Sequence, residues 1–259
     1  MAESAIQIVF VYYLTTKQNI TNDHLLYKPD ALAEAYRQWK EEKRGPLSTF
    51  PFGAFAFARL DERLTNEPAW KNAPRKEGRD PMGLTKSQPN IEFFSTECYG
   101  GPKQYADFPD GENTHAFSLI AELFAPKSRG SVTLKSADPK DNPIVDHNYL
   151  AEELDLVVLS EACRFANEII TQGKGTKDIV AGSWPKTLTH HTHTKREEWV
   201  PFVKENATTC KPSLVLCSEI STITDIIQAT ILEERARWAP RRIQWLSWMK
   251  NFVFEELRG

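Results

Sequence analysis

The sequence predicts an α+β fold in which helices pack on a mostly antiparallel sheet, with a helical C-terminal tail. Several stretches have a pattern typical of strands: their apolar and polar residues alternate, or they are apolar throughout. Each is bounded by Gly, Pro, Asn or Asp. Other stretches repeat apolar residues at helical spacing. The connections between them are long, and strands interspersed with packing helices are typical of α+β proteins.

The clearest strand lies at residues 115–123. Its apolar residues alternate with polar ones, so that one face carries Phe117, Leu119, Ala121 and Leu123 and the other carries Ser118 and Glu122. Residues 6–15 are apolar throughout and predict a strand at the edge of the sheet. Residues 50–60, with Gly53 marking a bulge, and residues 91–99 predict two more strands.

A turn and a second short strand follow the 115–123 strand. Pro126 ends that strand because proline has no N–H for a ladder hydrogen bond. Residues 128–130 then form a turn in which Gly130 is free to adopt a positive φ. Val132 and Leu134 begin a second alternation. The pattern alone predicts an ordinary antiparallel pair of strands, followed by an irregular arm to Leu150.

Three helices are predicted. The first opens at Pro29-Asp30, where Asp30 accepts from exposed N–H groups, and continues to Arg44. The longest spans about residues 152–171, and Thr194 caps a third at about 195–204. Residues 61–89 carry many charges and four prolines, which predicts a long surface excursion with one short helix at most.

Composition excludes several classes of protein. The net charge of −3 gives no electrostatic reason to expect nucleic acid as a partner. No apolar run is long enough to span a membrane. The N-terminus lacks a basic residue before its apolar patch, so no secretory signal is indicated and a cytoplasmic location is expected as the sequence stands. The four cysteines show no metal-binding spacing and fit a reduced compartment, although two disulfides remain possible.

Residues 126–150 resemble a known family. They follow a P-x-S-R-G-x-V-x-L motif and then a D-P-x-x-x-P-x-I-D-x-x-Y-L run, as found in the C-terminal substrate domain of glucose-methanol-choline (GMC) oxidoreductases. The matching residues, in order, are Pro126, Ser128, Arg129, Gly130, Val132, Leu134, Asp138, Pro139, Pro143, Asp146, Tyr149 and Leu150. The resemblance extends from about Leu14 to Cys210 and is greatest to fungal alcohol-oxidase-like members.

The resemblance implies a reaction and a cofactor. GMC oxidoreductases oxidise a small-molecule alcohol to an aldehyde by transferring hydride to the flavin of FAD. They hold the FAD pyrophosphate through a G-x-G-x-x-G motif at a helix N-terminus. This sequence contains no such motif. We therefore expect that the chain alone does not bind FAD.

The resemblance also implies a catalytic histidine that this sequence lacks. In the family it lies in an H-P-x-G-T run shortly after an A-T-T-C segment. Here Ala207–Cys210 matches that segment, but residues 211–216 (KPSLVL) follow. The second catalytic His or Asn has no counterpart either, so no catalytic residue is assigned. Residues 1–218 are interpreted as a truncated substrate domain, inactive alone; a changed reading frame, a retained intron and a mispredicted gene end all fit.

Four kinds of side chain invite a more specific function. The resemblance makes Phe93, Phe94 and Phe117 candidates to line a hydrophobic substrate pocket facing the flavin, with core packing as the ordinary alternative. The histidines His190, His191 and His193 could ligate a metal, but a solvated loop is the favoured interpretation, and no metal site is assigned. Lys174 and Lys177, beside glycines, are interpreted as part of a polar loop, and Arg129 is expected to be structural rather than catalytic.

Two other functions remain open. The chain could be a subunit that completes an active site with a separate flavin-binding chain. Alternatively, residues 219–259, which are unrelated to the family, could act as an interaction module. That tail repeats apolar residues at helical spacing, includes Trp245 and Trp248, and has a basic cluster near Pro240. The ordinary alternative is a helix that packs on its own domain.

Overall fold

The structure is a computed structural model, and it describes residues 2–3, 6–15, 21–48, 52–96 and 115–209. All of these belong to one compact unit, Met1–Cys210. The predicted tail, its boundary at residue 218 and the segment after Cys210 lie outside the described residues, so those expectations stay predictions.

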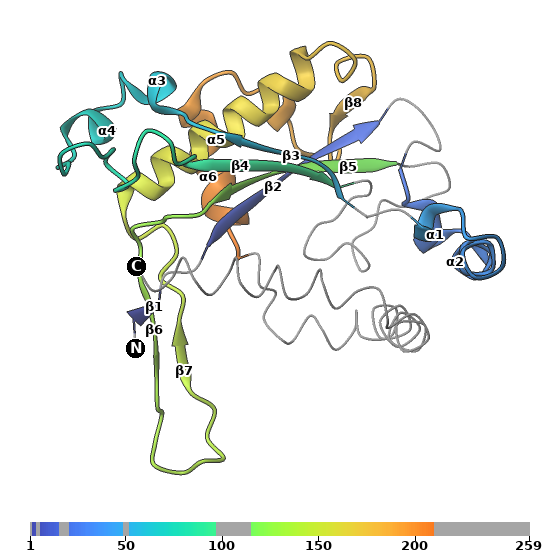
Figure 1. Cartoon of the computed structure of the whole chain (residues 1–259), viewed down its shortest axis with the longest axis horizontal. Helices are drawn as coiled ribbons and strands as arrows, with labels where there is room; N and C mark the ends of the chain where they lie inside the picture. The colour runs from blue at the N-terminus through green and yellow to red at the C-terminus, as the bar shows by residue number, and fades with distance from the viewer. Residues whose placement is uncertain (1, 4–5, 16–20, 49–51, 97–114, 210–259) are drawn as a thin grey trace, which may run out of the picture. The chain divides into compact units, whose positions relative to one another are not determined.

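A five-stranded sheet forms the centre of this unit (Figure 1). Its strand order is β3 (Phe52–Ala58), β4 (Ile91–Thr96), β5 (Ala116–Leu123), β2 (Gln7–Thr15) and β8 (Val180–Ser183), and every neighbouring pair is antiparallel. This confirms the predicted fold class.

The predicted edge position of β2 is wrong, because β2 lies between β5 and β8. Its residues are apolar throughout because both of its faces are covered: Val9 and Val11 are buried on one side and Ile8 on the other. The predicted alternation of β5 is confirmed, since Leu119, Ala121 and Leu123 share the buried face with Val9.

Two helices cover one face of the sheet, α5 (Glu153–Gln172) and α6 (Arg196–Asn206) (Figure 1). Both lie within two residues of their predicted bounds. The predicted cap of α6 is wrong, because the Thr194 side chain does not cap the helix. Instead the Glu198 carboxylate accepts hydrogen bonds from the backbone N–H groups of Thr194 and Lys195, at 2.8 Å each.

The main core lies between this face and the two helices. Its fully buried members come from β2, β4, β5, both helices and the start and end of α3 (Leu60 and Leu64), and Trp199 on α6 is the largest. One polar pair is built into it: the Tyr13 hydroxyl donates to Asn167 Oδ1 at 3.0 Å, while the Asn167 amide donates to the carbonyl oxygens of His191 and His193. Asn167 thereby ties α5 to the loop before α6. Burial raises the pKa of the Cys163 thiol well above its usual range.

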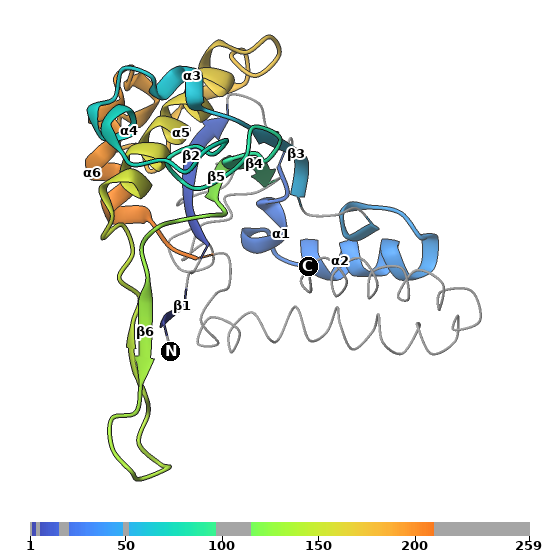
Figure 2. The same cartoon turned by 60° about the vertical axis from the view of Figure 1, so that its left-hand side comes forward.

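A separate three-stranded sheet contains β1 (Ala2–Glu3), β6 (Gly130–Thr133) and β7 (Ile144–Asp146). Strands β6 and β7 form a hairpin that projects away from the five-stranded sheet (Figures 1 and 2). The predicted pairing of the 115–123 strand with the strand that follows is therefore wrong. Strand β5 is already paired on both sides, with β2 and β4.

Gly130 begins β6 and does not need a positive φ, contrary to the expectation from the turn. It is required for a close approach instead. A side-chain Cβ at this position would collide with the backbone carbonyl oxygens of Asp146 and His147. The glycine of the motif therefore lets the two arms of the hairpin come together.

The predicted helix of residues 29–44 is broken. It consists of α2 (Ala31–Arg37) and a π-helical turn (Gln38–Glu42), preceded by the short α1 (His24–Tyr27) and followed by a 3₁₀ turn (Pro46–Ser48). Asp30 has a φ of 62° and its side chain makes no capping hydrogen bond, so the predicted cap is wrong.

The excursion of residues 61–89 contains two short helices, α3 (Asp61–Leu64) and α4 (Pro68–Asn72), where at most one was predicted. Packing on α5 stabilises α3: the Arg63 guanidinium contacts Glu161 at 2.6 Å and Glu168 at 2.5 Å. None of the helices among the described residues is long and apolar enough to cross a membrane.

Candidate functional site

The face of the sheet opposite α5 carries a grid of aromatic and apolar side chains, which we call the aromatic face. The strand register aligns Phe55, Phe94, Ile120 and Phe10 in one row across four strands. The rings of Phe55 and Phe94 are stacked, with centroids 5.3 Å apart. Phe55 and its neighbour Phe57 are 48% and 61% exposed, which is unusual for phenylalanine on a sheet.

The three predicted substrate-lining residues do not share a surface. Phe94 lies on the aromatic face and is packed with Ile8 and Ile120. Phe93 lies in the main core, with its ring edge-on to Phe165 of α5 at 5.7 Å. Phe117 is also on the helix side, stacked on Tyr13. Of the three, Phe94 alone belongs to the aromatic face.

Polar side chains interrupt the aromatic face in two rows. Glu92 on β4 stands directly opposite Glu122 on β5, and both are buried. Two rows along, the hydroxyl groups of Thr96 and Ser118 are 2.7 Å apart. Burial raises the pKa of the Glu92 carboxyl above its ordinary value. Burial therefore favours the neutral, protonated form of Glu92 over its charged form.

Replacing Glu92 with glutamine should therefore stabilise the protein at neutral pH. A raised folded-state pKa means that stability falls as pH rises from the ordinary value of 4.5 through the folded-state value. We expect Glu92→Gln to add about 1 kcal/mol at pH 7 and nothing at pH 4, as measured by urea unfolding. Glu62→Gln, at an exposed position on α3, is the control. A loss of stability at pH 7 would contradict the assignment.

His190 is buried, which corrects the expectation of a solvated loop at this residue, while His191 and His193 are half-buried. His190 begins a 3₁₀ turn (His190–Thr192) and is 1% exposed, with its ring against Tyr13, Trp199 and Phe202. Its Nε2–H donates to the Tyr12 carbonyl oxygen at 2.7 Å. Its buried Nδ1 has no hydrogen-bond partner among the described residues.

The three imidazoles make separate structural contacts. His191 Nδ1 lies 2.8 Å from the Ser183 hydroxyl, and the His191 backbone N–H donates to the same oxygen. His193 contacts Trp199 edge-on. Within the described part of the chain, no group of three His, Cys, Asp or Glu side chains is arranged to hold a metal ion.

Acid should unfold the protein through His190. Burial lowers the pKa of His190 from 6.5 to about 4, because a proton on Nδ1 would create an unpartnered charge in an apolar site. The unfolded chain binds that proton first, so stability falls as pH drops from 6.5 towards 4. We expect a loss of about 2–3 kcal/mol from this group, since one pKa unit corresponds to roughly 1.4 kcal/mol.

Urea unfolding of wild type and His190→Gln at pH 7 and pH 4.5 measures this effect. Glutamine keeps a donor for the Tyr12 carbonyl but does not titrate. The variant should lose less stability on acidification than the wild type, whereas His147→Gln, at an exposed position, should behave like wild type. Parallel pH profiles for all three proteins would contradict the role of His190.

The motif of residues 126–130 is anchored by a residue that the sequence did not single out. Asp155, in the first turn of α5, is fully buried. Its carboxylate accepts hydrogen bonds from the backbone N–H groups of Lys127 at 2.7 Å and Ser128 at 2.8 Å. In return the Ser128 hydroxyl accepts from the backbone N–H of Glu152 at 3.1 Å. The motif thus fixes the base of the hairpin to the start of α5.

Arg129 has a structural role, as expected. Its guanidinium donates to the carbonyl oxygens of Pro126 at 2.5 Å and Ser128 at 3.0 Å, within its own turn.

The described residues do not fit FAD by themselves. Dinucleotide sites of this class need a parallel strand–helix–strand unit and a glycine-rich turn whose N–H groups meet the pyrophosphate. Both sheets of the described part are antiparallel. The N-terminus of its longest helix, α5, is occupied by the contacts of Asp155 and Ser128.

Comparisons with known proteins agree with this architecture. Residues 126–212 match the family model described as GMC oxidoreductase. A glucose methanol choline oxidoreductase of Aspergillus terreus is 25% identical over 175 residues, covering 67% of this chain and 27% of that protein. Versicolorin B synthase of Aspergillus parasiticus is 26% identical over 187 residues, covering 72% and 26%. The chain therefore spans about a quarter of the length of these curated relatives.

Solved structures share the fold. A formate oxidase superposes with a TM-score of 0.65 at 22% identity, over 80% of this chain and 35% of that one. A fungal aryl-alcohol oxidase superposes with a TM-score of 0.50 at 16% identity, over 80% and 37%. Residues 126–212 are therefore similar to the C-terminal domain of GMC oxidoreductases, and the described part of the chain shares the fold of these solved structures.

Proposed function

We propose that this chain supplies the substrate-binding wall of a flavin-dependent enzyme that oxidises the CH–OH group of an alcohol to an aldehyde. The observation that carries the proposal is the aromatic face. Its row of Phe55, Phe94, Ile120 and Phe10 is apolar, and its exposed end at Phe55 suits aryl or aliphatic alcohols, while Phe94 and Ile120 are buried. Helices α5 and α6 occupy the other face, so a substrate and the flavin of a neighbouring domain would meet the sheet on this side, at its β3 edge, where Phe55 and Phe57 are exposed.

The chain does not carry out this reaction alone. It contains no G-x-G-x-x-G motif and no H-P-x-G-T run, and its described residues do not fit FAD. FAD, when bound, would accept the hydride. The contribution of these residues is to position the alcohol and to exclude water from one side of it.

A flavin titration tests the inactive state. Purified chain mixed with FAD should return a flavin spectrum identical to that of free FAD, and gel filtration should separate the two. A flavin band that elutes with the protein near one equivalent would contradict the proposal. Turnover of benzyl alcohol or 1-butanol by the freshly purified chain would do so as well.

The projecting hairpin favours assembly with a flavin-binding portion, whether it belongs to the same polypeptide or to another. The hairpin exposes four aliphatic side chains. They are Val132 (44% exposed) on β6, Leu134 (84%) just after it, and Ile144 (54%) and Val145 (51%) on β7. Exposed aliphatic residues on a hairpin that extends from its domain are typical of a surface that another domain covers. Co-purification from the source cell should recover a G-x-G-x-x-G-bearing segment, and its absence would count against this arrangement.

The aromatic face can be tested separately. In a ¹H–¹³C spectrum of aromatic side chains, benzyl alcohol should shift the resonances of Phe94 and Phe55 and leave those of Phe93 and Phe117 unchanged. Phe94→Leu should reduce the shifts at Phe55, while Phe117→Leu, on the opposite side of the sheet, should not. Equal shifts on both faces would contradict the assignment of the substrate wall.

A further inference from the structure

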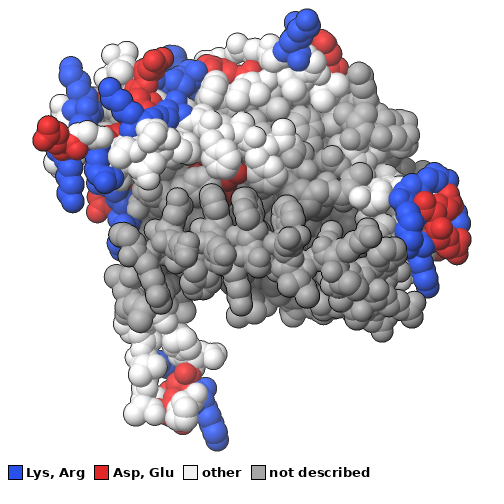
Figure 3. Space-filling view, in the orientation of Figure 1, with Lys and Arg blue, Asp and Glu red and all other residues white. Residues whose placement is uncertain are grey.

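A pocket of about 520 Å³ is lined by the loop after α4, which connects β3 to β4, and by Lys127. Its charged lining residues are four cations and one carboxylate: Arg75, Lys76, Arg79, Lys127 and Asp80. Figure 3 shows Lys and Arg side chains gathered over α4 and this loop, with acidic groups among them. The chain as a whole has a net charge of −3, so the basic character of this pocket is local.

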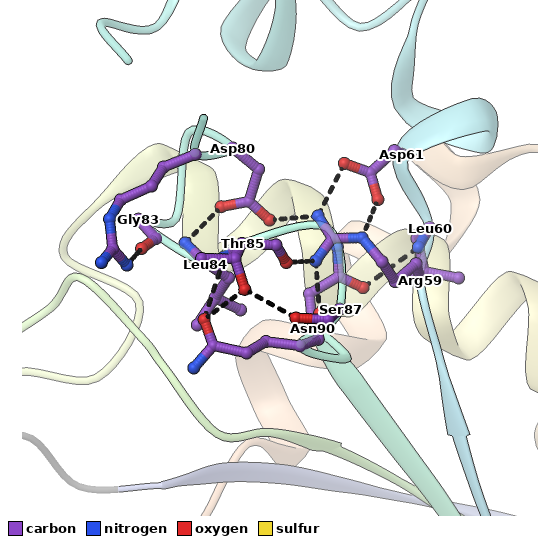
Figure 4. Close-up of polar contacts among 11 residues, drawn as sticks. Arg59, Leu60, Asp61, Asp80, Gly83, Leu84, Thr85, Ser87 and Asn90 are labelled. Carbon is purple, nitrogen blue, oxygen red and sulfur yellow. Dashed lines mark hydrogen bonds and ion pairs between the residues drawn. The ribbon is translucent and has the colours of Figure 1, made fainter. Parts of the chain in front are cut away.

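The one lining carboxylate does not neutralise the pocket. The Asp80 side chain is 4% exposed, and its Oδ2 pairs with the Arg59 guanidinium at 2.7 Å. Its Oδ1 accepts from the backbone N–H of Leu84 at 2.8 Å. Figure 4 shows both contacts of the Asp80 carboxylate. Glu77 lies in the same loop but does not line the pocket.

Two of the cations are held in place by the backbone. Arg75 donates from Nη2 to the Trp70 carbonyl oxygen at 2.6 Å, and Arg79 donates from Nη1 to the Gly83 carbonyl oxygen at 2.6 Å. Each guanidinium has five N–H donors, and neither forms an ion pair with a carboxylate of the described residues. Both are therefore oriented before a ligand arrives and still have donors to offer it.

The loop that carries these cations is closed by its own hydrogen bonds. Asp80 N–H donates to the Leu84 carbonyl oxygen at 2.8 Å, and Arg79 and Thr85 form an antiparallel bridge. Gly78 and Gly83 have φ values of 70° and 90°, which a residue with a side chain rarely adopts. Arg59 fixes the far side by donating to the carbonyl oxygens of Thr85 and Gln88 (Figure 4).

We propose that this pocket binds the phosphoryl group of a small ligand, either a phosphomonoester or pyrophosphate. Four neighbouring cations that form no ion pair among the described residues repel one another, and a multiply charged anion relieves that repulsion. Planar guanidinium groups match the oxygens of phosphate in a two-point geometry, which a monovalent halide cannot use. The site is independent of the substrate wall, and its residues lie outside the aromatic face.

Calorimetric titration of the purified chain tests the proposal. Inorganic phosphate, pyrophosphate and glycerol 3-phosphate are each added in chloride buffer at constant ionic strength. Saturable binding of at least one is expected. Tighter binding of glycerol 3-phosphate would indicate a phosphomonoester as the ligand, and tighter binding of pyrophosphate would indicate pyrophosphate. No saturable binding of any of the three to wild type would overturn the site.

Two variants and a control locate the binding. Arg75→Gln/Arg79→Gln should weaken binding at least tenfold, and Lys76→Gln/Lys127→Gln should weaken it severalfold without disturbing the two arginine–carbonyl contacts. Lys135→Gln/Lys140→Gln removes the same charge from the exposed hairpin and should bind as wild type does. Equal weakening in all three would show a non-specific charge effect and overturn the proposal. Binding of polyglutamate without binding of any of the three phosphate ligands would also overturn the proposal, because it would indicate a docking surface for an acidic protein.

Discussion

Replacing Asp155 with alanine should lower the free energy of unfolding by about 4 kcal/mol, because it leaves two backbone N–H groups without an acceptor and removes a charge matched to its site. The carboxylate is fully buried and accepts from Lys127 and Ser128. It also lies in the first turn of α5, where the helix dipole favours a negative charge. Urea unfolding followed by circular dichroism measures the loss.

Two variants separate these contributions. Asp155→Asn keeps one oxygen acceptor and should lose about half as much stability. Glu153→Ala removes a carboxylate from the same helical turn at an exposed position, so it tests the dipole alone and should cost under about 0.5 kcal/mol. Amide exchange should accelerate at Lys127 and Ser128 in the Asp155 variants only. An Asp155→Ala protein as stable as Glu153→Ala would show that the anchor of the motif is not energetically important.

The spacing of apolar residues along the chain was sufficient to predict the elements that pack an apolar face against the main core. The stripe of α5 and the alternation of β5 both survive in the structure, because the apolar face of each lies on the main core, although Ser118, Ile120 and Glu122 on the other face of β5 are buried as well. The period of a strand does not reveal its partners. Strand β5 pairs with β2, about 110 residues earlier in the chain, rather than with the adjacent β6, and no local pattern carries that information.

The candidate site was harder to predict for a related reason. Phe93 and Phe94 are adjacent, so a strand must place them on opposite faces, but the sequence does not tell which face meets the helices. His190 lies among threonines and looks solvated, yet the Tyr12 carbonyl and the Trp199 ring bury it from distant parts of the chain. In the sequence, Asp155 resembles any acidic residue in the first turn of a helix. Only the structure shows that it accepts hydrogen bonds from the backbone of Lys127 and Ser128.

Replacing Arg59 with alanine should cost about 3 kcal/mol, because it strands the Asp80 carboxylate in a buried site. Arg59 contacts Asp61 through two nitrogens, at 2.7 and 2.9 Å, and Asp80 at 2.7 Å, while it also donates to the Thr85 carbonyl oxygen. These contacts join the end of β3 to the loop after α4 (Figure 4). Without them the loop should open, and limited trypsin digestion should cleave after Lys76 or Arg79 more rapidly than in wild type.

The comparison with Arg37→Ala decides whether burial or the number of ion pairs is responsible. Arg37 contacts Glu34 on α2 and Glu41 in the π-helical turn that follows, but its side chain is 45% exposed against 22% for Arg59. Solvent screens such pairs, so Arg37→Ala should leave stability almost unchanged. The double variant Arg59→Met/Asp80→Asn should recover part of the loss of Arg59→Ala, since it removes the stranded charge. If it recovers none, the donations to the Thr85 and Gln88 carbonyl oxygens, rather than the buried ion pair, hold this loop in place.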